Sequence, residues 1–204
     1  MTQIITNLYE KEGIENTRAT LEIVKTRAEE LDIKQLVAAT TTGQTALDCA
    51  ERMPEMKTIV GVTMHAIDTE ILVNRHGKKV LAKDSEIMEK ARKAGVIFYT
   101  GVHPFRGAIS SAMHERFQGY SAQDIVSEVL MKFFSTGMKV ALECAIMAAD
   151  GGLINTEEEV IAIGGYRGGA DTAVVLRPAF SYRMFEMNVR EILAYPRLRP
   201  DETE

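Results

Sequence analysis

Hydroxyl side chains gather around a single glycine in one short stretch of the chain, residues 40–45, which we call the threonine loop. Its members are Thr40, Thr41, Thr42, Gly43, Gln44 and Thr45. A turn of this kind before a helix leaves backbone N–H groups without partners at the positive end of the helix dipole. The glycine lets the backbone approach a ligand closely, and the threonine hydroxyls add donors. We therefore expect these six residues to line a phosphate pocket.

The residues on either side of the threonine loop have the patterns that such a turn requires. The apolar run before it, residues 36–39, has the length of a strand. After it, Ala46, Cys49 and Ala50 recur at helical spacing, and Pro54 ends the pattern. The loop matches neither the Gly-Lys-Ser/Thr phosphate loop nor the Gly-x-Gly-x-x-Gly dinucleotide turn. The alternative interpretation is that the threonines only cap the helix.

A second loop, residues 164–171, holds four glycines within six residues, and we call it the glycine loop. Each glycine loses much conformational entropy on folding, so a plain turn would not favour so many. We expect Gly165, Gly168 and Asp171 to lie against a ligand. Apolar runs flank the loop at residues 160–163 and 173–176, and so short a link between two strands predicts an antiparallel pair.

Polar residues also follow two further predicted strands. The continuous apolar run of residues 58–63 is typical of a buried parallel strand, and it ends at Met64 and His65. A strand over residues 96–99 leads into a long loop that contains Arg106. Open α/β sheets bind ligands at the carboxyl ends of their strands, so we expect Met64, His65 and Arg106 to contact the ligand. The alternatives are a loop histidine bonded to backbone or water, and an exposed arginine in a lid-like connection.

The remaining pattern places these loops on an alternation of strands and helices. Helices are predicted over residues 16–31, 46–53, 85–94, 121–133 and 138–150. The order predicts one domain over residues 1–204, a three-layer α/β/α sandwich with a mostly parallel sheet. Residues 180–195 fit either a helix or an edge strand. Residues 108–120 have no clear pattern.

Composition excludes several classes of function. The chain has 204 residues, a net charge of −5 and no basic stripe, which argues against nucleic acid as a partner. No apolar run approaches the ~20 residues that span a membrane, so we expect no membrane partner. Scattered histidines and two isolated cysteines, Cys49 and Cys144, predict no metal site and a reduced, cytoplasmic protein.

Two segments resemble the C-terminal domain of pyruvate kinase. The first is Leu-Val-Ala-Ala-Thr-Thr-Thr-Gly-Gln-Thr-Ala from Leu36, followed by Pro54 and Ile-Val-Gly-Val-Thr from Ile59. The second is Val-Ile-Ala-Ile-Gly-Gly-Tyr-Arg-Gly-Gly-Ala-Asp-Thr-Ala from Val160. In pyruvate kinase the corresponding loops together hold a sugar bisphosphate effector. The resemblance is closer still to a family of small stand-alone archaeal and bacterial proteins, members of which bind FMN.

This resemblance implies a five-stranded sheet whose last strand is antiparallel, and a bound FMN as cofactor. It does not imply pyruvate kinase activity, because the catalytic barrel of that enzyme has no counterpart in the chain. Gln44 stands where the family's phosphate loop usually has arginine, which weakens charge pairing with a bisphosphate.

Three functions follow from these observations. The first is an FMN-binding protein, in which any flavin-dependent oxidoreductase activity is left open. The second is a non-catalytic regulatory or sensing module for another phosphorylated metabolite, working as a homo-oligomer. The third is an enzyme acting on a phospho-sugar or nucleotide with His65 or His103 as acid/base, which no visible nucleophile–base pair supports.

Overall fold

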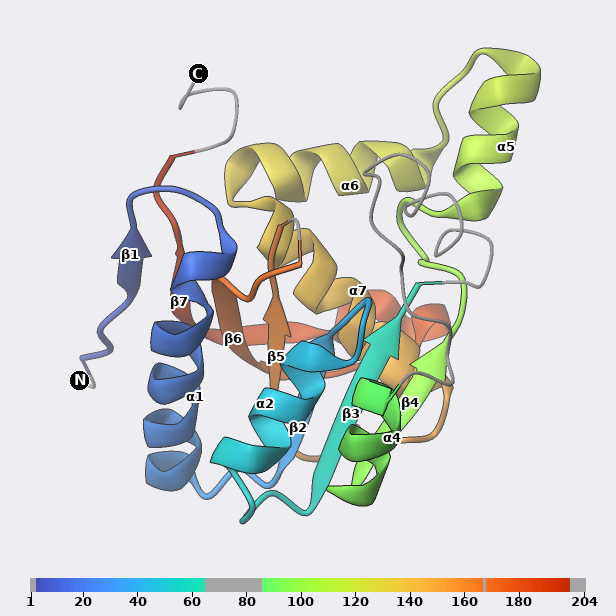
Figure 1. The fold of residues 1–204 in the computed structure, drawn as a ribbon. Helices are drawn as coiled ribbons and strands as arrows, with labels where there is room; N and C mark the ends of the chain where they lie inside the picture. The colour runs from blue at the N-terminus through green and yellow to red at the C-terminus, as the bar shows by residue number, and fades with distance from the viewer. Residues whose placement is uncertain (1–2, 65–85, 167, 199–204) are drawn as a thin grey trace.

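A computed structural model of the chain describes residues 3–64, 86–166 and 168–198. Its centre is a seven-stranded sheet in the order β1-β7-β6-β5-β2-β3-β4 (Figure 1). The strands are β1 (Asn7–Tyr9), β2 (Gln35–Ala39), β3 (Thr58–Thr63), β4 (Val96–Thr100), β5 (Val160–Gly164), β6 (Thr172–Arg177) and β7 (Asn188–Pro196). Strands β5, β2, β3 and β4 pair in parallel, and β6 is antiparallel to both of its neighbours.

Helices cover both faces of the sheet, which confirms the three-layer α/β/α sandwich (Figure 1). The helices are α1 (Thr17–Leu31), α2 (Gln44–Arg52), α4 (Glu86–Lys93), α5 (Ala108–Phe117), α6 (Ala122–Phe133) and α7 (Thr136–Asp150), with short 3-10 helices η1 (Ile14–Asn16) and η2 (Ser181–Glu186). Helices α1, α2 and α4 cover one face. Helix α7 covers the other face, and α6 packs on α7.

The sequence forms these layers because its central strands are apolar on both faces. Along β2, Leu36 and Ala38 join the core beneath α1, α2 and α4, whereas Val37 joins the core beneath α7. Neighbouring strand β5 divides in the same way. Twelve of the 15 residues of α7 are buried, so its many small side chains allow close approach to the sheet.

The sheet has seven strands, so the expectation of five was wrong in number. Both additional strands come from the ends of the chain: β1 pairs in parallel with β7, which pairs antiparallel with β6. Residues 180–195 therefore form η2 and most of β7, an interior strand where an edge strand or helix was expected. Strand β6 is antiparallel as predicted, but two more strands lie beyond it.

Residues 108–133 form two successive helices, α5 and α6. The unassigned residues 108–120 contain helix α5, whose residues are mostly exposed. Before α6, the Ser121 side chain accepts from the amide of Asp124, and the Asp124 carboxylate accepts from the amide of Ser121. This reciprocal pair is the capping box that the sequence predicts.

Cys49 and Cys144 are free and fully buried in the core, where burial raises the pKa of each thiol. Among the described residues, no helical segment combines the length and the apolar character that a membrane span requires.

Candidate functional site

The threonine loop and the glycine loop emerge from neighbouring strands at the same edge of the sheet. Strands β2 and β5 are parallel, with Ala38 opposite Ile163, and each loop follows directly. From β2 the chain passes through α2 to β3 on one side, whereas from β5 it turns to β6 on the other. Strand order thus reverses between β2 and β5, and open α/β sheets bind ligands at such a point.

The threonine loop is held in shape by its own hydroxyl groups. Thr40 is buried; its amide donates to the carbonyl of Val62 at 2.9 Å, and its Oγ1 accepts from the amide of Gly43 at 3.0 Å. The Oγ1 of Thr42 accepts from the amide of Gln44 at 3.4 Å. Two of the hydroxyls therefore hold the turn itself, whereas the N-cap residue of α2 is Gly43, which has no side chain to cap the helix.

Glycine is required at position 43 for two physical reasons. Gly43 has a φ of 90°, in the left-handed region that side chains disfavour. A Cβ atom there would also lie 2.9 Å from Cγ of Met88 on α4. The turn between β2 and α2 is therefore tight against α4.

Four backbone amides in and just after the threonine loop are the candidates for binding a ligand. Within the described part of the chain, no acceptor takes the amide hydrogen of Thr41, Thr42, Thr45 or Ala46. Thr41 and Thr42 are half-buried. The side chain of Thr45 is buried and makes no hydrogen bond to another described residue. Unpaired amides at a helix N-terminus are the groups that bind phosphate oxygens.

A second helix N-terminus, that of α7, lies at the same edge from the opposite face of the sheet. The Oγ of Ser135 accepts from the amide of Met138 and lies 3.0 Å from Oγ1 of Thr172 at the start of β6. A Cβ atom on Gly164 would lie 2.1 Å from the carbonyl oxygen of Gly137. Sequence reasoning missed this feature, for which the Ser135-Thr136-Gly137 break was the available signal. The positive ends of two helix dipoles thus face the carboxyl edge.

The glycines of the glycine loop are needed for close approaches within the chain itself. A Cβ atom on Gly165 would lie 2.0 Å from the carbonyl oxygen of Gly169. One on Gly169 would lie 2.4 Å from Cα of Ile14, in the N-terminal segment that packs over the loop. Gly168 has a φ of 92°. The conformational cost of these glycines is therefore already explained by packing, before any ligand is considered.

Asp171 anchors the N-terminal segment to the glycine loop. Its side chain is fully buried, Oδ2 accepts from the amide of Gly13 at 3.2 Å, and Oδ1 accepts from the hydroxyl of Thr172 at 2.9 Å. Burial, with a smaller contribution from the carboxylate of Glu12, raises the pKa of Asp171 to about 6. Asp171 thus positions the loop from within the protein.

A buried charged cluster lies below the loop that follows β4. Glu143 of α7 is fully buried, and each of its oxygens accepts two hydrogen bonds. Oε2 accepts from Nζ of Lys139 at 2.6 Å and lies 3.0 Å from Nδ1 of His103. Oε1 accepts from the amides of Phe105 and Arg106 at 2.8 and 3.0 Å. The loop of residues 103–106 is therefore fixed by one carboxylate.

This cluster also determines how His103 presents its second nitrogen. With Oε2 of Glu143 as a carboxylate acceptor, we assign a ring hydrogen to Nδ1; in the neutral imidazole this tautomer has its lone pair on Nε2. Nε2 is enclosed and has no hydrogen-bond partner among the described residues. Burial would raise the pKa of Glu143, but the bond from His103 and the charge of Lys139 outweigh it and lower that pKa. The sequence signal for Glu143 was two charges, four residues apart, in an otherwise apolar helix.

The other predicted contact residues are distributed around this edge. Met64 is half-buried at the end of β3, where the hydroxyls of Thr63 and Thr100 lie 2.7 Å apart. The guanidinium of Arg106 pairs with Glu128 of α6 at 2.6 Å, so it is directed to α6. His65 lies outside the described residues. Gln44 is exposed and donates to Asp48.

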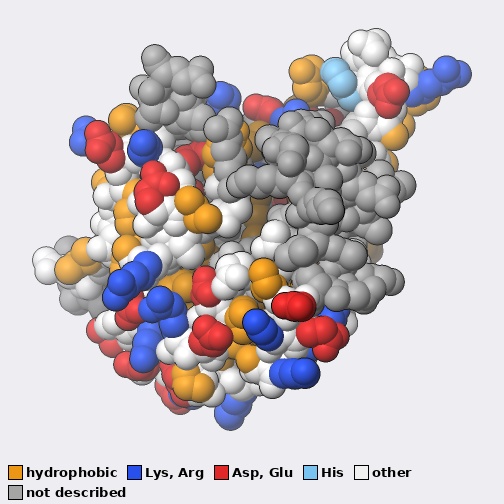
Figure 2. All heavy atoms as spheres, in the orientation of Figure 1, with side chains coloured by type: hydrophobic (Ala, Val, Ile, Leu, Met, Phe, Trp, Pro, Cys, Tyr) orange, Lys and Arg blue, Asp and Glu red, His pale blue; other side chains and the backbone are white. Residues whose placement is uncertain are grey.

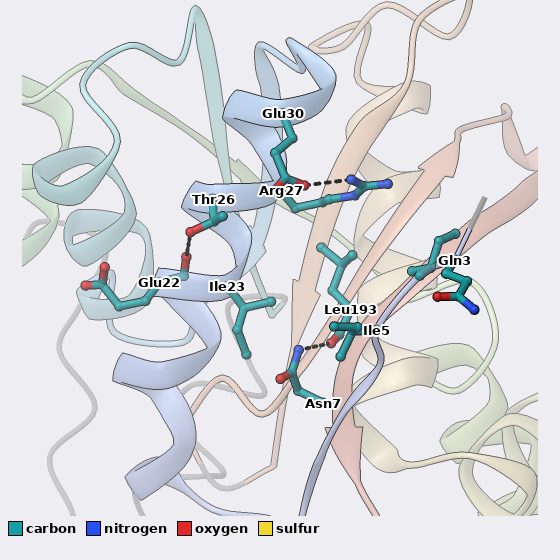
Figure 3. Close-up of a pocket in the computed structure, with 10 residues that line it drawn as sticks. Gln3, Ile5, Asn7, Glu22, Ile23, Thr26, Arg27, Glu30 and Leu193 are labelled. Carbon is teal, nitrogen blue, oxygen red and sulfur yellow. Dashed lines mark hydrogen bonds and ion pairs between the residues drawn. The ribbon is translucent and has the colours of Figure 1, made fainter.

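A separate pocket of about 510 Å³ lies between α1 and the N-terminal segment (Figure 3). The guanidinium of Arg27 in its wall bonds both carboxylate oxygens of Glu191 and also Glu30. Two carboxylates therefore neutralise this cation, so the pocket does not suit a phosphate group. Among the described residues, no group of three His, Cys, Asp or Glu side chains could hold a metal ion.

Comparison with protein families places the candidate site in a known domain. A family model described as "Pyruvate kinase, alpha/beta domain" matches residues 18–176, from the start of α1 to the end of β6. The match includes the threonine loop, the glycine loop and the His103–Glu143 cluster. It leaves out β1 and β7, the two strands beyond the expected five. The chain belongs to the pyruvate kinase alpha/beta domain family.

Proposed function

We propose that this protein binds a phosphorylated ligand, with FMN as the first candidate, across the carboxyl edge of β2 and β5. The observation that carries the proposal is the set of amides at Thr41, Thr42, Thr45 and Ala46, beside the N-terminus of α2, for which the described residues supply no acceptor. The buried hydroxyl of Thr45 adds a donor. The glycine loop, beside the threonine loop on β5, would form the opposite wall.

The charge around the threonine loop favours a single phosphate group. Gln44 stands at the N-terminus of α2, and two described cations on the loop after β4 and on α7, Arg106 and Lys139, are paired with Glu128 and Glu143. Neutral amides and helix dipoles can balance one phosphomonoester better than the higher charge of a sugar bisphosphate. This argues for a nucleotide such as FMN over a bisphosphate effector.

The ring of such a nucleotide would extend toward the ends of β3 and β4. Adjacent strands lie about 4.8 Å apart, so the end of β4 is roughly 10 Å from the end of β2. That separation suits a ligand with its phosphate at one end and a flat ring at the other. Met64 and the loop of residues 103–106 would contact the ring. We propose binding here and assign no redox reaction.

The alternative is a regulatory module that binds a different phosphorylated metabolite through the same amides. Ligand preference separates the two. We expect the purified protein to absorb in the blue region, or its apo form to keep that absorbance after FMN is added and unbound FMN is removed by gel filtration. FMN should bind more tightly than riboflavin, which has the same ring without the phosphate. Equal affinity for the two would overturn the phosphate assignment, and no affinity for FMN would favour the regulatory alternative.

Variants test whether the threonine loop is the site. Replacing Thr45 with valine should weaken FMN binding by roughly 1–3 kcal/mol if its hydroxyl bonds the phosphate. Thr26→Val on the exposed face of α1 is the matched control, because its hydroxyl bonds only the carbonyl of Glu22. Isothermal calorimetry measures both. Unchanged FMN affinity in Thr45→Val would move the anion site elsewhere.

A further inference from the structure

Helix α5 projects from the body of the protein beside α6 (Figure 1). Of its ten residues, only Ser110 is buried. Isolated helices shorter than ~12–15 residues are marginal in water, so a ten-residue helix needs packing to be stable. The described part of the chain supplies little of that packing, so α5 has most of its surface open to a further contact.

Both α5 and α6 carry an exposed apolar stripe with the same spacing. The α5 stripe consists of Ile109, Met113 and Phe117, and the α6 stripe consists of Ile125, Val129 and Phe133. Within each stripe the residues are four apart and lie on one helix face. Tyr120 and Phe134 extend the two stripes. We call these eight residues the α5–α6 surface, and between 38% and 76% of each is exposed. Figure 2 shows hydrophobic side chains on the projecting helix α5.

The size of the α5–α6 surface matches that of a stable interface. A covered aromatic side chain buries about 150–250 Å², so eight large apolar residues exposed to this degree leave on the order of 800–1,000 Å². A standard interface buries about 800 Å² on each partner. One protomer therefore exposes about as much apolar area as one side of a dimer requires.

The charges on the two helices disfavour a lipid surface as the occupant. Helices that lie on membranes are rich in Lys and Arg on their polar face. Helices α5 and α6 together carry three acidic side chains and two basic ones, in a chain with a net charge of −5. The two equally spaced stripes, in contrast, are complementary to each other. A two-fold axis would bring each stripe onto the other stripe of a second copy.

We propose that the α5–α6 surface is the docking site for a second copy of this chain. The α5 stripe of each copy lies on the α6 stripe of the other. The base of α5 is joined to the candidate ligand site, because Arg106 pairs with Glu128 and its amide bonds Glu143. The dimer contact therefore holds the loop of residues 103–106 from outside. This inference does not depend on which ligand binds.

Sedimentation velocity of the full chain tests the proposal. We expect a dimer that dissociates on dilution, and we expect Phe117→Asp and Phe133→Asp each to raise the dissociation constant about 30-fold or more. Phe185→Asp is the control, because Phe185 is an exposed aromatic on η2, outside the surface, and its replacement should change nothing. All three positions are exposed, so circular dichroism should confirm an intact fold. A wild-type monomer at every concentration would overturn the proposal, as would a dimer insensitive to both stripe variants.

Disulfide trapping tests the arrangement of the two helices. The pair Met113→Cys and Val129→Cys should give a covalent dimer under oxidation, because it joins the centres of the two stripes. The native thiols do not compete, since Cys49 and Cys144 are fully buried. Equal trapping by Met113→Cys alone would overturn the α5-on-α6 arrangement. Binding of the monomer to anionic lipid vesicles would overturn the choice of partner.

Discussion

Nδ1 of His103 lies 3.0 Å from Oε2 of Glu143, although the two residues belong to different elements 40 positions apart. Glu143 is a carboxylate inside the protein that is saturated by four donors, so it orients its partners and cannot itself contact a ligand. His103 is consequently held with its Nε2 lone pair in an enclosed position at the end of β4. Glu143 is therefore the residue of α7 that positions the loop of residues 103–106.

Replacing Glu143 with glutamine should lower the free energy of unfolding strongly. In either orientation the new NH2 group would face two donors, His103 and Lys139 or the amides of Phe105 and Arg106, and the buried cation of Lys139 would lose the charge that balances it. Breaking a buried ion pair in this way costs about 3–5 kcal/mol. Urea unfolding near neutral pH measures the loss. A second replacement, Lys139→Met, should recover part of it by removing the unpaired charge.

Glu157→Gln is the matched control for this prediction. Glu157 pairs with Arg177 on the surface, where 78% of the glutamate side chain is exposed. Exposed pairs contribute about 0–1 kcal/mol. If the two glutamine variants lost similar stability, Glu143 would not hold the loop as described.

Two threonines of the threonine loop should separate stability from ligand binding. Thr40→Val removes the acceptor for the amide of Gly43, so it should reduce the free energy of unfolding by about 1–2 kcal/mol even without ligand. The hydroxyl of Thr45 makes no hydrogen bond to another described residue, so Thr45→Val should cost under ~1 kcal/mol without ligand. Unfolding of the ligand-free protein checks both values. Equal losses would mean that Thr45 is also a structural cap.

Burial of Asp171 should make the protein less stable as the pH rises. Its pKa is raised from 3.8 to about 6, so the folded state binds the proton more tightly than the unfolded state between those values. The stability contribution is fully present below about pH 4 and is lost as the pH rises through about 6. Between about pH 4 and pH 6, the free energy of unfolding of the wild type minus that of Asp171→Asn should fall by up to ~3 kcal/mol. Urea unfolding across the window measures it, and a difference independent of pH would contradict the raised pKa.

Gly137→Ala should destabilise the protein although alanine is the better helix former. In a solvent-exposed helix the change would gain about 1 kcal/mol. Here the added Cβ would lie 2.2 Å from Oγ1 of Thr172 and 2.6 Å from Oδ1 of Asp171, both buried. Overpacking of this kind costs about 1–3 kcal/mol, so the thermal midpoint should fall. Gly119→Ala is the control, because its nearest neighbour would be 3.9 Å away. A rise in the midpoint of Gly137→Ala would show that α7 can move away from the sheet.

The central strands were predicted correctly because their signal is local. Continuous apolar runs such as residues 58–63 form strands buried on both faces, and the short link after Gly164 permits only an antiparallel neighbour. Strand β7 gave a weaker signal, because its first three residues are exposed and its pattern fits a helix as well. Its assignment depends on pairing with β1, which is distant in the sequence.

Some features of the candidate site were evident in the sequence, and others appear only in the folded chain. The strand–turn–helix pattern of the threonine loop was evident in the sequence, since its glycine, hydroxyls and helical spacing are neighbours in the chain. The role of Glu143 was not, because a charged residue in a helix has no partner until the chain folds. The glycine loop had the right composition, but the close approaches that require glycine are to Ile14, Gly137 and the loop itself.

The sequence by itself determined the five strands β2 to β6 with five of the helices, the parallel core and the two loops that follow β2 and β5. These follow from hydrophobic period and turn chemistry, which act over a few residues. Only the tertiary structure decided that the two chain ends add strands to the sheet, that Glu143 fixes His103, and that α5 stands apart with its apolar stripe uncovered. Such contacts join residues far apart in the chain, and their energy depends on burial and geometry that exist only after folding.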